Sequence, residues 1–140
     1  MDPLQSVQAR IAGFPGYGDD LSRRRSDAYV RSYLGEALAS LEARFGTLEP
    51  VLQQRFGDLL LRVGFADSES FTTHNGLAER AETKSDPAPA LAGGDAATLD
   101  VADRAQSVDA AAVGQYLDDV TATLDRREAA MRAAAHPAMP

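Results

Sequence analysis

Hydrophobic residues recur at intervals of mostly three and four across residues 16–45, the spacing that marks one face of an α-helix. Asp19 or Asp20 is expected to cap this helix at its start, and Gly46 stands where a C-terminal cap belongs. Gly35 falls in the middle, where a close approach of another helix would compensate its low helix propensity. The apolar stripe expected to enter the core comprises Leu21, Ala28, Val30, Leu34, Ala37, Leu38, Leu41 and Phe45.

A second apolar stripe follows almost at once. Thr47 is expected to cap this helix, and Glu49 and Pro50 fit its first turn, where a negative charge and a missing N–H are both tolerated. Because the connection through Gly46 is so short, the two helices should form an antiparallel hairpin over residues 19–63. The second stripe is Leu48, Val51, Leu52, Phe56, Leu59, Leu60 and Val63.

The chain begins with a shorter element. Asp2 followed by Pro3 is typical of an N-cap and a first helical residue, and predicts a helix to about Ala12. A loop rich in Gly and Pro comes next. Its two aromatic residues, Phe14 and Tyr17, should not face solvent, so we expect them to hold the loop against the bundle.

Composition divides the rest of the chain. Residues 1–81 are expected to form an N-terminal helical region, and residues 82–98, rich in Ala, Pro and Gly, a flexible linker. Residues 99–135 should form one C-terminal amphipathic helix, followed by a tail at 136–140. The fold class is therefore all-α, an antiparallel helical hairpin plus a long C-terminal helix, giving a three- to four-helix bundle.

The C-terminal helix carries an a/d seam that lacks one member. The seam is Val113, Leu117, Val120, Leu124 and Met131. The part before Val113 is only weakly apolar, which allows a break near Ser107. Two outcomes stay open: the helix docks in cis and completes the bundle, or it swings out as a coiled-coil surface for itself or another chain.

Composition limits the possible functions. The chain has 140 residues, of which 44% are hydrophobic, but much of this fraction is alanine. Only nine residues are aromatic and none is Trp, so the core should be thin. A partner or a second copy could bury the apolar faces that remain exposed. A net charge of −7 makes nucleic-acid binding an unfavoured function. The sequence shows no signal-peptide pattern and no apolar run of about eighteen residues, so we expect a cytoplasmic protein without a membrane span.

No residue cluster indicates catalysis. With no Cys, thiolate nucleophiles and zinc–thiolate sites are excluded, and the two histidines, His74 and His136, stand apart in the sequence. Neither a nucleophile elbow nor a phosphate-binding loop is present. We therefore expect no enzyme activity, no catalytic residue, no cofactor and no metal site.

Charged residues gather early in the first long helix. Arg23, Arg24 and Arg25 point in different directions around a helix, so they cannot all face one ligand, and neighbouring aspartates can pair with them. A ladder at helical spacing could face solvent or pair with acids on the last helix. The ladder is Asp20, Arg24, Asp27 and Arg31, and the acids are Asp118, Asp119 and Asp125.

Two segments carry a resemblance. The first contains Gly16, Tyr17, Asp20, Arg23 or Arg24, Asp27, Val30, Arg31, Leu34 and Leu38, and the second runs from Leu117 through Leu124, Asp125, Arg126, Arg127 and Glu128. Together they resemble a family of small uncharacterised bacterial all-helical proteins, over about half of the chain. The resemblance implies a compact helical domain with a structural arginine–aspartate ladder, and it implies no activity.

The sequence favours a non-catalytic helical interaction or accessory protein that could self-associate as a homodimer, with any other protein partner unknown. The residues expected on the partner surface are Arg23, Arg24, Arg31, Tyr33, Leu117, Leu124 and Arg127. The alternative is a regulatory module that binds nucleic acid or another acidic partner through the cluster Arg23–Arg25. A third hypothesis, a small hydrolase or metal-dependent enzyme, would need several carboxylates gathered around His74.

Overall fold

The structure, a computed structural model, describes residues 2–70 and 86–135. In these ranges the chain forms five α-helices and no strand, which confirms the all-α prediction. The α-helices are α1 (Pro3–Arg10), α2 (Asp20–Phe45), α3 (Pro50–Ser70), α4 (Ala88–Arg104) and α5 (Val113–Ala135). Two short 3₁₀ turns, Ala105–Ser107 and Ala110–Ala112, join the last two.

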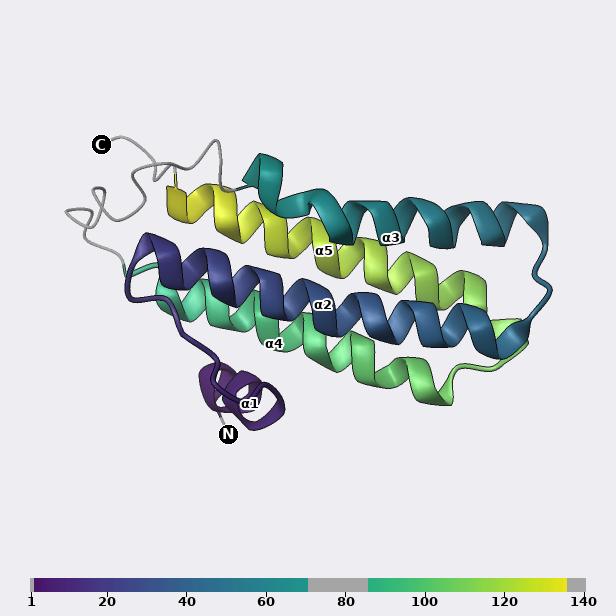
Figure 1. The fold of residues 1–140 in the computed structure, drawn as a ribbon, viewed down its shortest axis with the longest axis horizontal. Coiled ribbons are helices and arrows are strands. Elements are labelled where there is room, and N and C mark those ends of the chain that lie inside the picture. The colour runs from purple at the N-terminus through teal and green to yellow at the C-terminus, as the bar shows by residue number, and fades with distance from the viewer. Residues whose placement is uncertain (1, 71–85, 136–140) are drawn as a thin grey trace.

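Four long helices make the bundle (Figure 1). Helices α2 and α3 form one antiparallel hairpin, and α4 and α5 form another. Helix α4 packs beside α2 and α3 packs beside α5, so α2 and α5 lie on opposite corners of the bundle. Helix α1 packs against α4. The last helix thus docks in cis in this structure.

The caps of α1 and α2 are the expected ones, whereas the predicted cap Thr47 is wrong, because α3 begins only at Pro50. Asp2 accepts a hydrogen bond from the Gln5 backbone N–H, and the Gln5 side chain accepts one in return, which is a capping box. Asp19 caps α2, and Gly46 ends it with a φ of 64°, a conformation that favours glycine. A methyl group at Gly35 would lie 3.6 Å from Val63 Cγ1, so the predicted approach of another helix to this glycine is confirmed, and that helix is α3.

Most of the two apolar stripes lie in the core, but Leu21, Ala28 and Val51 are exposed, which corrects the prediction for them. The step from Leu21 to Ala28 is seven residues, and the next, to Val30, is two; a step of two moves to a different helix face. The fully buried core residues of the bundle include Leu34, Leu38, Leu41, Phe56, Val113, Leu117 and Val120.

Residues 88–98 are helical and packed, so the prediction of a flexible linker over 82–98 is wrong for them; residues 82–85 lie outside the described residues. Leu91, Ala92, Asp95, Ala96, Thr98 and Leu99 are all buried. Alanine is a strong helix former, and Pro89 falls at the start of the helix, where proline is tolerated. Composition alone suggested flexibility, because the residues that pack against this segment and bury it are distant in sequence.

The predicted single helix over 99–135 is two helices. Helix α4 ends at Arg104, and α5 begins at Val113 after the two 3₁₀ turns, so a break does occur around Ser107. Asp109 caps the second turn by accepting from the Ala112 N–H. Helix α3 continues beyond Val63 to Ser70. The predictions for residues 71–81 and for the tail 136–140, with His74 and His136, fall outside the described residues.

The loop before α2 is held against the bundle as expected. Tyr17 is buried and Phe14 partly buried, and their rings meet edge to face with centroids 5.6 Å apart. Phe14 also packs on the cluster formed by Val7, Ile11 and Val30. The loop therefore joins α1, α2 and α4 into one packed unit.

Candidate functional site

Arg127 occupies the missing position of the α5 seam, between Leu124 and Met131. The residue is 3% exposed, and its guanidinium lies between two carboxylates from two other helices. Nη2 donates to Asp27 Oδ1 on α2 over 2.5 Å, and Nε donates to Asp95 Oδ1 on α4 over 2.8 Å. One arginine therefore ties α5 to both α2 and α4.

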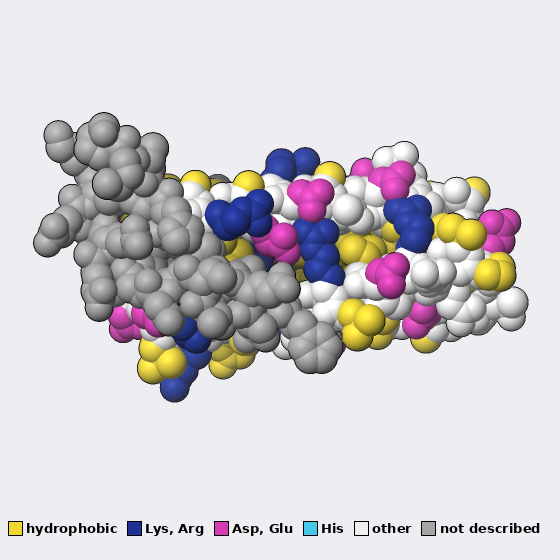
Figure 2. Space-filling model, turned by 90° about the horizontal axis from the view of Figure 1, so that it is seen from above, with side chains coloured by type: hydrophobic (Ala, Val, Ile, Leu, Met, Phe, Trp, Pro, Cys, Tyr) yellow, Lys and Arg dark blue, Asp and Glu magenta, His cyan; other side chains and the backbone are white. Residues whose placement is uncertain are grey.

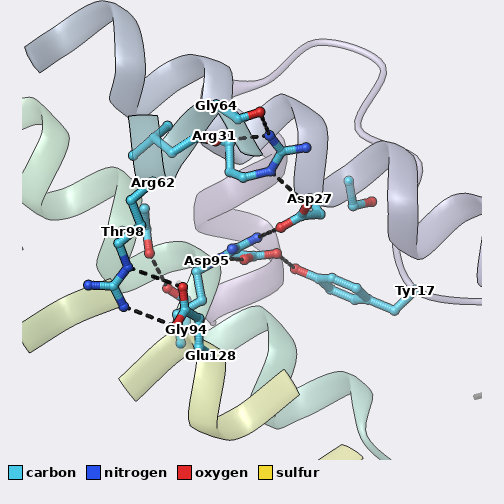
Figure 3. A network of polar contacts seen from close by, with 12 residues as sticks. Tyr17, Asp27, Arg31, Arg62, Gly64, Gly94, Asp95, Thr98 and Glu128 are labelled. Carbon is cyan, nitrogen blue, oxygen red and sulfur yellow. Dashed lines mark hydrogen bonds and ion pairs between the residues drawn. The ribbon is translucent and has the colours of Figure 1, made fainter. Parts of the chain in front are cut away.

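Asp27 takes a second arginine on its other oxygen. Arg31, one turn further along α2, donates from Nε to Asp27 Oδ2 over 2.7 Å. Its Nη1 donates to the backbone oxygens of Val63 and Gly64 on α3, at 2.9 and 3.3 Å (Figure 3). We call Asp27, Arg31, Asp95 and Arg127 the charged layer; it holds two positive and two negative groups and reaches all four long helices.

The N-terminal loop is tied to the same layer. The Tyr17 hydroxyl donates to Asp95 Oδ2 over 2.6 Å (Figure 3), and the Ser26 hydroxyl donates to the Gly16 backbone oxygen over 2.7 Å. Behind Arg127 the α4 backbone comes very close, because a Cβ on Gly94 would lie 3.5 Å from the Arg127 Cα. A Cβ at this distance would be in ordinary van der Waals contact, so α4 and α5 pack closely beside the Asp95–Arg127 pair, and only a side chain longer than alanine would force them apart.

Burial and pairing act against each other in the charged layer. Burial raises the pKa of the Asp95 carboxyl, although the charge of Arg127 and the hydrogen bond from Tyr17 oppose the rise. Burial alone would lower the pKa of Arg127, but the carboxylates of Asp95 and Asp27 outweigh it and raise the pKa. Burial and then the charge of Asp95 raise the pKa of the Tyr17 phenol far above its ordinary value. Arg127 thus stays charged and Tyr17 stays protonated.

Further ion pairs join the helices at the surface. Arg62 on α3 donates from Nη2 to Asp125 over 2.7 Å and to Glu128 over 3.0 Å, both on α5. Arg55, also on α3, reaches Asp118. From above the bundle, basic and acidic side chains are interspersed, with no large area of one sign among the described residues (Figure 2). The described part of this face offers no basic patch to a nucleic acid.

Five of the seven residues expected on the partner surface are inside the folded bundle. Each of these five is at most 8% exposed; they are Arg23, Arg31, Leu117, Leu124 and Arg127. Of the other two, Arg24 is half-buried and pairs with Asp20 over 3.1 Å, and Tyr33 donates its hydroxyl to Asp103 over 2.5 Å. The seven therefore do not form one surface in this fold. The seam leucines complete the core because α5 docks in cis.

The ladder along α2 pairs with the last helix, but with the opposite sign from the one expected. One of its two acids, Asp27, takes an arginine from α5, whereas Asp118, Asp119 and Asp125 pair with Arg55, Arg104 and Arg62. An available signal was the gap in the α5 seam, since a charged residue at a core position needs a buried partner. Nothing local marked Asp95, because its segment reads as a linker.

The surface of α2 that faces away from the bundle carries exposed apolar side chains, as does α3 at Val51 and Leu61, which are 69% and 60% exposed. Leu21 is 58% exposed and Tyr29 46%, and Arg25, Ser32 and Glu36 are exposed beside them. We call these five residues the outer ridge of α2. A shallow groove runs along it, lined by Gly13, Pro15, Arg25, Ala28, Tyr29 and Ser32. Neither Arg25 nor Glu36 has an ion-pair or hydrogen-bond partner among the described side chains.

Comparison of the chain with protein families, with characterised proteins and with solved structures finds no match. The resemblance to small bacterial helical proteins gains no support from it. Within residues 2–70 and 86–135, no three acidic or imidazole side chains are grouped to hold a metal ion. None of the helices described is both long and apolar enough to cross a membrane.

Proposed function

We propose that this protein is a non-catalytic helical interaction protein, an accessory or adaptor subunit, and that it binds through the outer ridge of α2. The observation that carries the proposal is the exposure of Leu21 and Tyr29 on a helix whose opposite face is fully packed. The two residues lie about two turns apart on the same side of α2, and exposed apolar side chains that gather on one face mark an interface. The proposal includes the cytoplasmic location expected from the sequence.

The charged layer has a supporting role in this proposal. Its four members are at most 8% exposed and pair with one another, so they are shielded from a solvent-borne partner. A buried charge network fixes which residues face each other, because a shifted register would leave charges unpaired. It thereby keeps α2 in place while the outer ridge stays free to bind.

The alternative function, nucleic-acid binding through the cluster Arg23–Arg25, is not favoured by how these arginines are placed. Arg23 is buried and Arg24 pairs with Asp20, which leaves Arg25 as the one exposed arginine of the three. A single exposed guanidinium provides little of the counterion release on which phosphate binding depends.

Site-specific photo-crosslinking tests the proposal. A photoreactive residue replaces Tyr29 on the outer ridge, and in a matched control it replaces Ala122, which is exposed on α5 at the opposite corner of the bundle. We expect position 29 to crosslink to a protein in cells and position 122 not to do so. Equal crosslinking from both positions, or none from position 29, would overturn the proposal.

A further inference from the structure

We infer that the partner of the outer ridge is a second copy of this chain, bound antiparallel through α2; this inference rests on the proposed function. It starts from two unpaired charges of opposite sign. Arg25 and Glu36 are both exposed, and both lack an ion pair among the described residues. Opposite charges left free on one interface are the usual means of setting orientation in a complex.

The spacing of the two charges suits self-pairing. They stand eleven residues apart, which is about three helical turns, so both point the same way and are separated by about 16 Å along the axis. In a two-fold dimer the same surface serves both subunits, and if residue i meets j then j meets i. An antiparallel pair of α2 helices therefore brings each Arg25 to the Glu36 of the other copy, twice per dimer.

The side chains between the charges fit this register. Where Arg25 lies opposite Glu36, Tyr29 lies opposite Ser32 of the second copy, because both pairs of numbers share the same midpoint. A large, half-exposed aromatic ring then packs over a small side chain at two symmetric places. The groove lined by Pro15, Ala28 and Tyr29 lies beside this α2–α2 contact and receives part of the second copy.

A parallel pair of α2 helices would not bring opposite charges together. In a parallel two-fold arrangement at matching register, Arg25 would face Arg25 and Glu36 would face Glu36, and like charges across an interface are unfavourable. The antiparallel arrangement satisfies all four charges. The charge pattern thus selects one orientation.

Charge reversal tests the inference with the full chain. R25E and E36R each place like charges opposite one another twice per dimer, so each variant should dimerise at least about tenfold more weakly than the wild type. An equimolar mixture of R25E and E36R should form a heterodimer. One of its two contacts joins the introduced carboxylate at position 25 to the introduced guanidinium at position 36, and the other joins the original Arg25 and Glu36.

The double variant R25E/E36R should also regain the dimer, because both contacts then pair opposite charges with the signs exchanged. Masses of the wild type, the variants and the mixture are read by light scattering. Helicity and unfolding curves confirm that every variant is folded.

Three results would overturn the inference: a wild type that stays monomeric, single variants that dimerise like the wild type, or a mixture that stays monomeric although both chains are folded. These results leave the proposed function standing if the photoreactive residue at position 29 still crosslinks to a different protein. Failure of that crosslink as well would remove both.

Discussion

Arg127 and Asp27 lie 100 residues apart in the sequence and form an ion pair of 2.5 Å between opposite corners of the bundle. Their side chains are 4% and 2% exposed. Such a pair costs much desolvation, which its Coulombic attraction repays only with good geometry and further hydrogen bonds. Asp95 and Arg31 supply these bonds, so the layer is balanced as a set and vulnerable to the loss of one member.

The first prediction concerns the loss of Arg127. Arg127→Met keeps much of the side-chain volume but leaves the buried Asp95 carboxylate without a cation and Asp27 with Arg31 alone, so the free energy of unfolding should fall by about 3–5 kcal/mol. The matched control is Arg126→Met, since Arg126 is the exposed neighbour and its loss should change stability by no more than about 0.5 kcal/mol. Urea unfolding measures both.

A rescue separates charge from packing in that experiment. Adding Asp95→Asn to Arg127→Met removes the carboxylate that lost its cation, keeps its shape and leaves the Asp27–Arg31 pair intact, so the double variant should be more stable than Arg127→Met alone. If Arg127→Met lowers the free energy of unfolding no more than Arg126→Met does, the charged layer has no part in holding the bundle together.

The second prediction is an alkaline loss of stability that depends on Tyr17. Its phenol keeps its proton in the fold, because burial and the charge of Asp95 raise the pKa, whereas in the unfolded chain it titrates near its ordinary value of 10.0. The unfolded state therefore holds fewer protons above pH 10, and stability is full below that pH and falls as the pH rises further. Tyr116, whose pKa burial raises to about 12, adds to the loss between these values.

Tyr17→Phe isolates the contribution of Tyr17. At neutral pH the variant should lose about 1–3 kcal/mol, because Asp95 Oδ2 gives up its hydrogen bond. Above pH 10 its stability should fall less steeply than that of the wild type, by up to about 1.4 kcal/mol per pH unit. Unfolding curves across this range give both values; identical slopes for the two proteins would refute a buried, protonated Tyr17.

The third prediction tests the close approach of α4 and α5. Leucine at Gly94 would extend beyond a Cβ that already lies 3.5 Å from the Arg127 Cα, so Gly94→Leu should destabilise the protein by about 1–3 kcal/mol. A Cβ at the neighbouring Gly93 would meet nothing within 4 Å, so Gly93→Leu should be neutral, or stabilising through its higher helix propensity. Thermal unfolding of the two variants measures the difference in stability. A Gly94→Leu variant as stable as Gly93→Leu would contradict the close packing of α4 on α5.

The sequence predicted what local spacing controls. The caps at Asp2, Asp19 and Gly46 and the seam of α5 follow from residues within a few positions of one another, and the structure has them. What could not be predicted depends on distant contacts. The segment around Asp95 reads as a linker because its partners, Tyr17 and Arg127, lie 78 and 32 residues away. The same distances hid which of the arginines are buried.

The most direct test of the central claim, that two copies of this chain pair through the outer ridge of α2 and not through α5, is the light-scattering mass of three proteins at one high concentration. They are the wild type, Tyr29→Glu on the ridge and Ala122→Glu on the exposed side of α5. The wild type and Ala122→Glu should have twice the chain mass of 14.9 kDa, whereas Tyr29→Glu should have the single chain mass while keeping its helicity and a cooperative unfolding transition. A monomeric wild type, or a dimer that survives Tyr29→Glu and is lost with Ala122→Glu, would contradict the account.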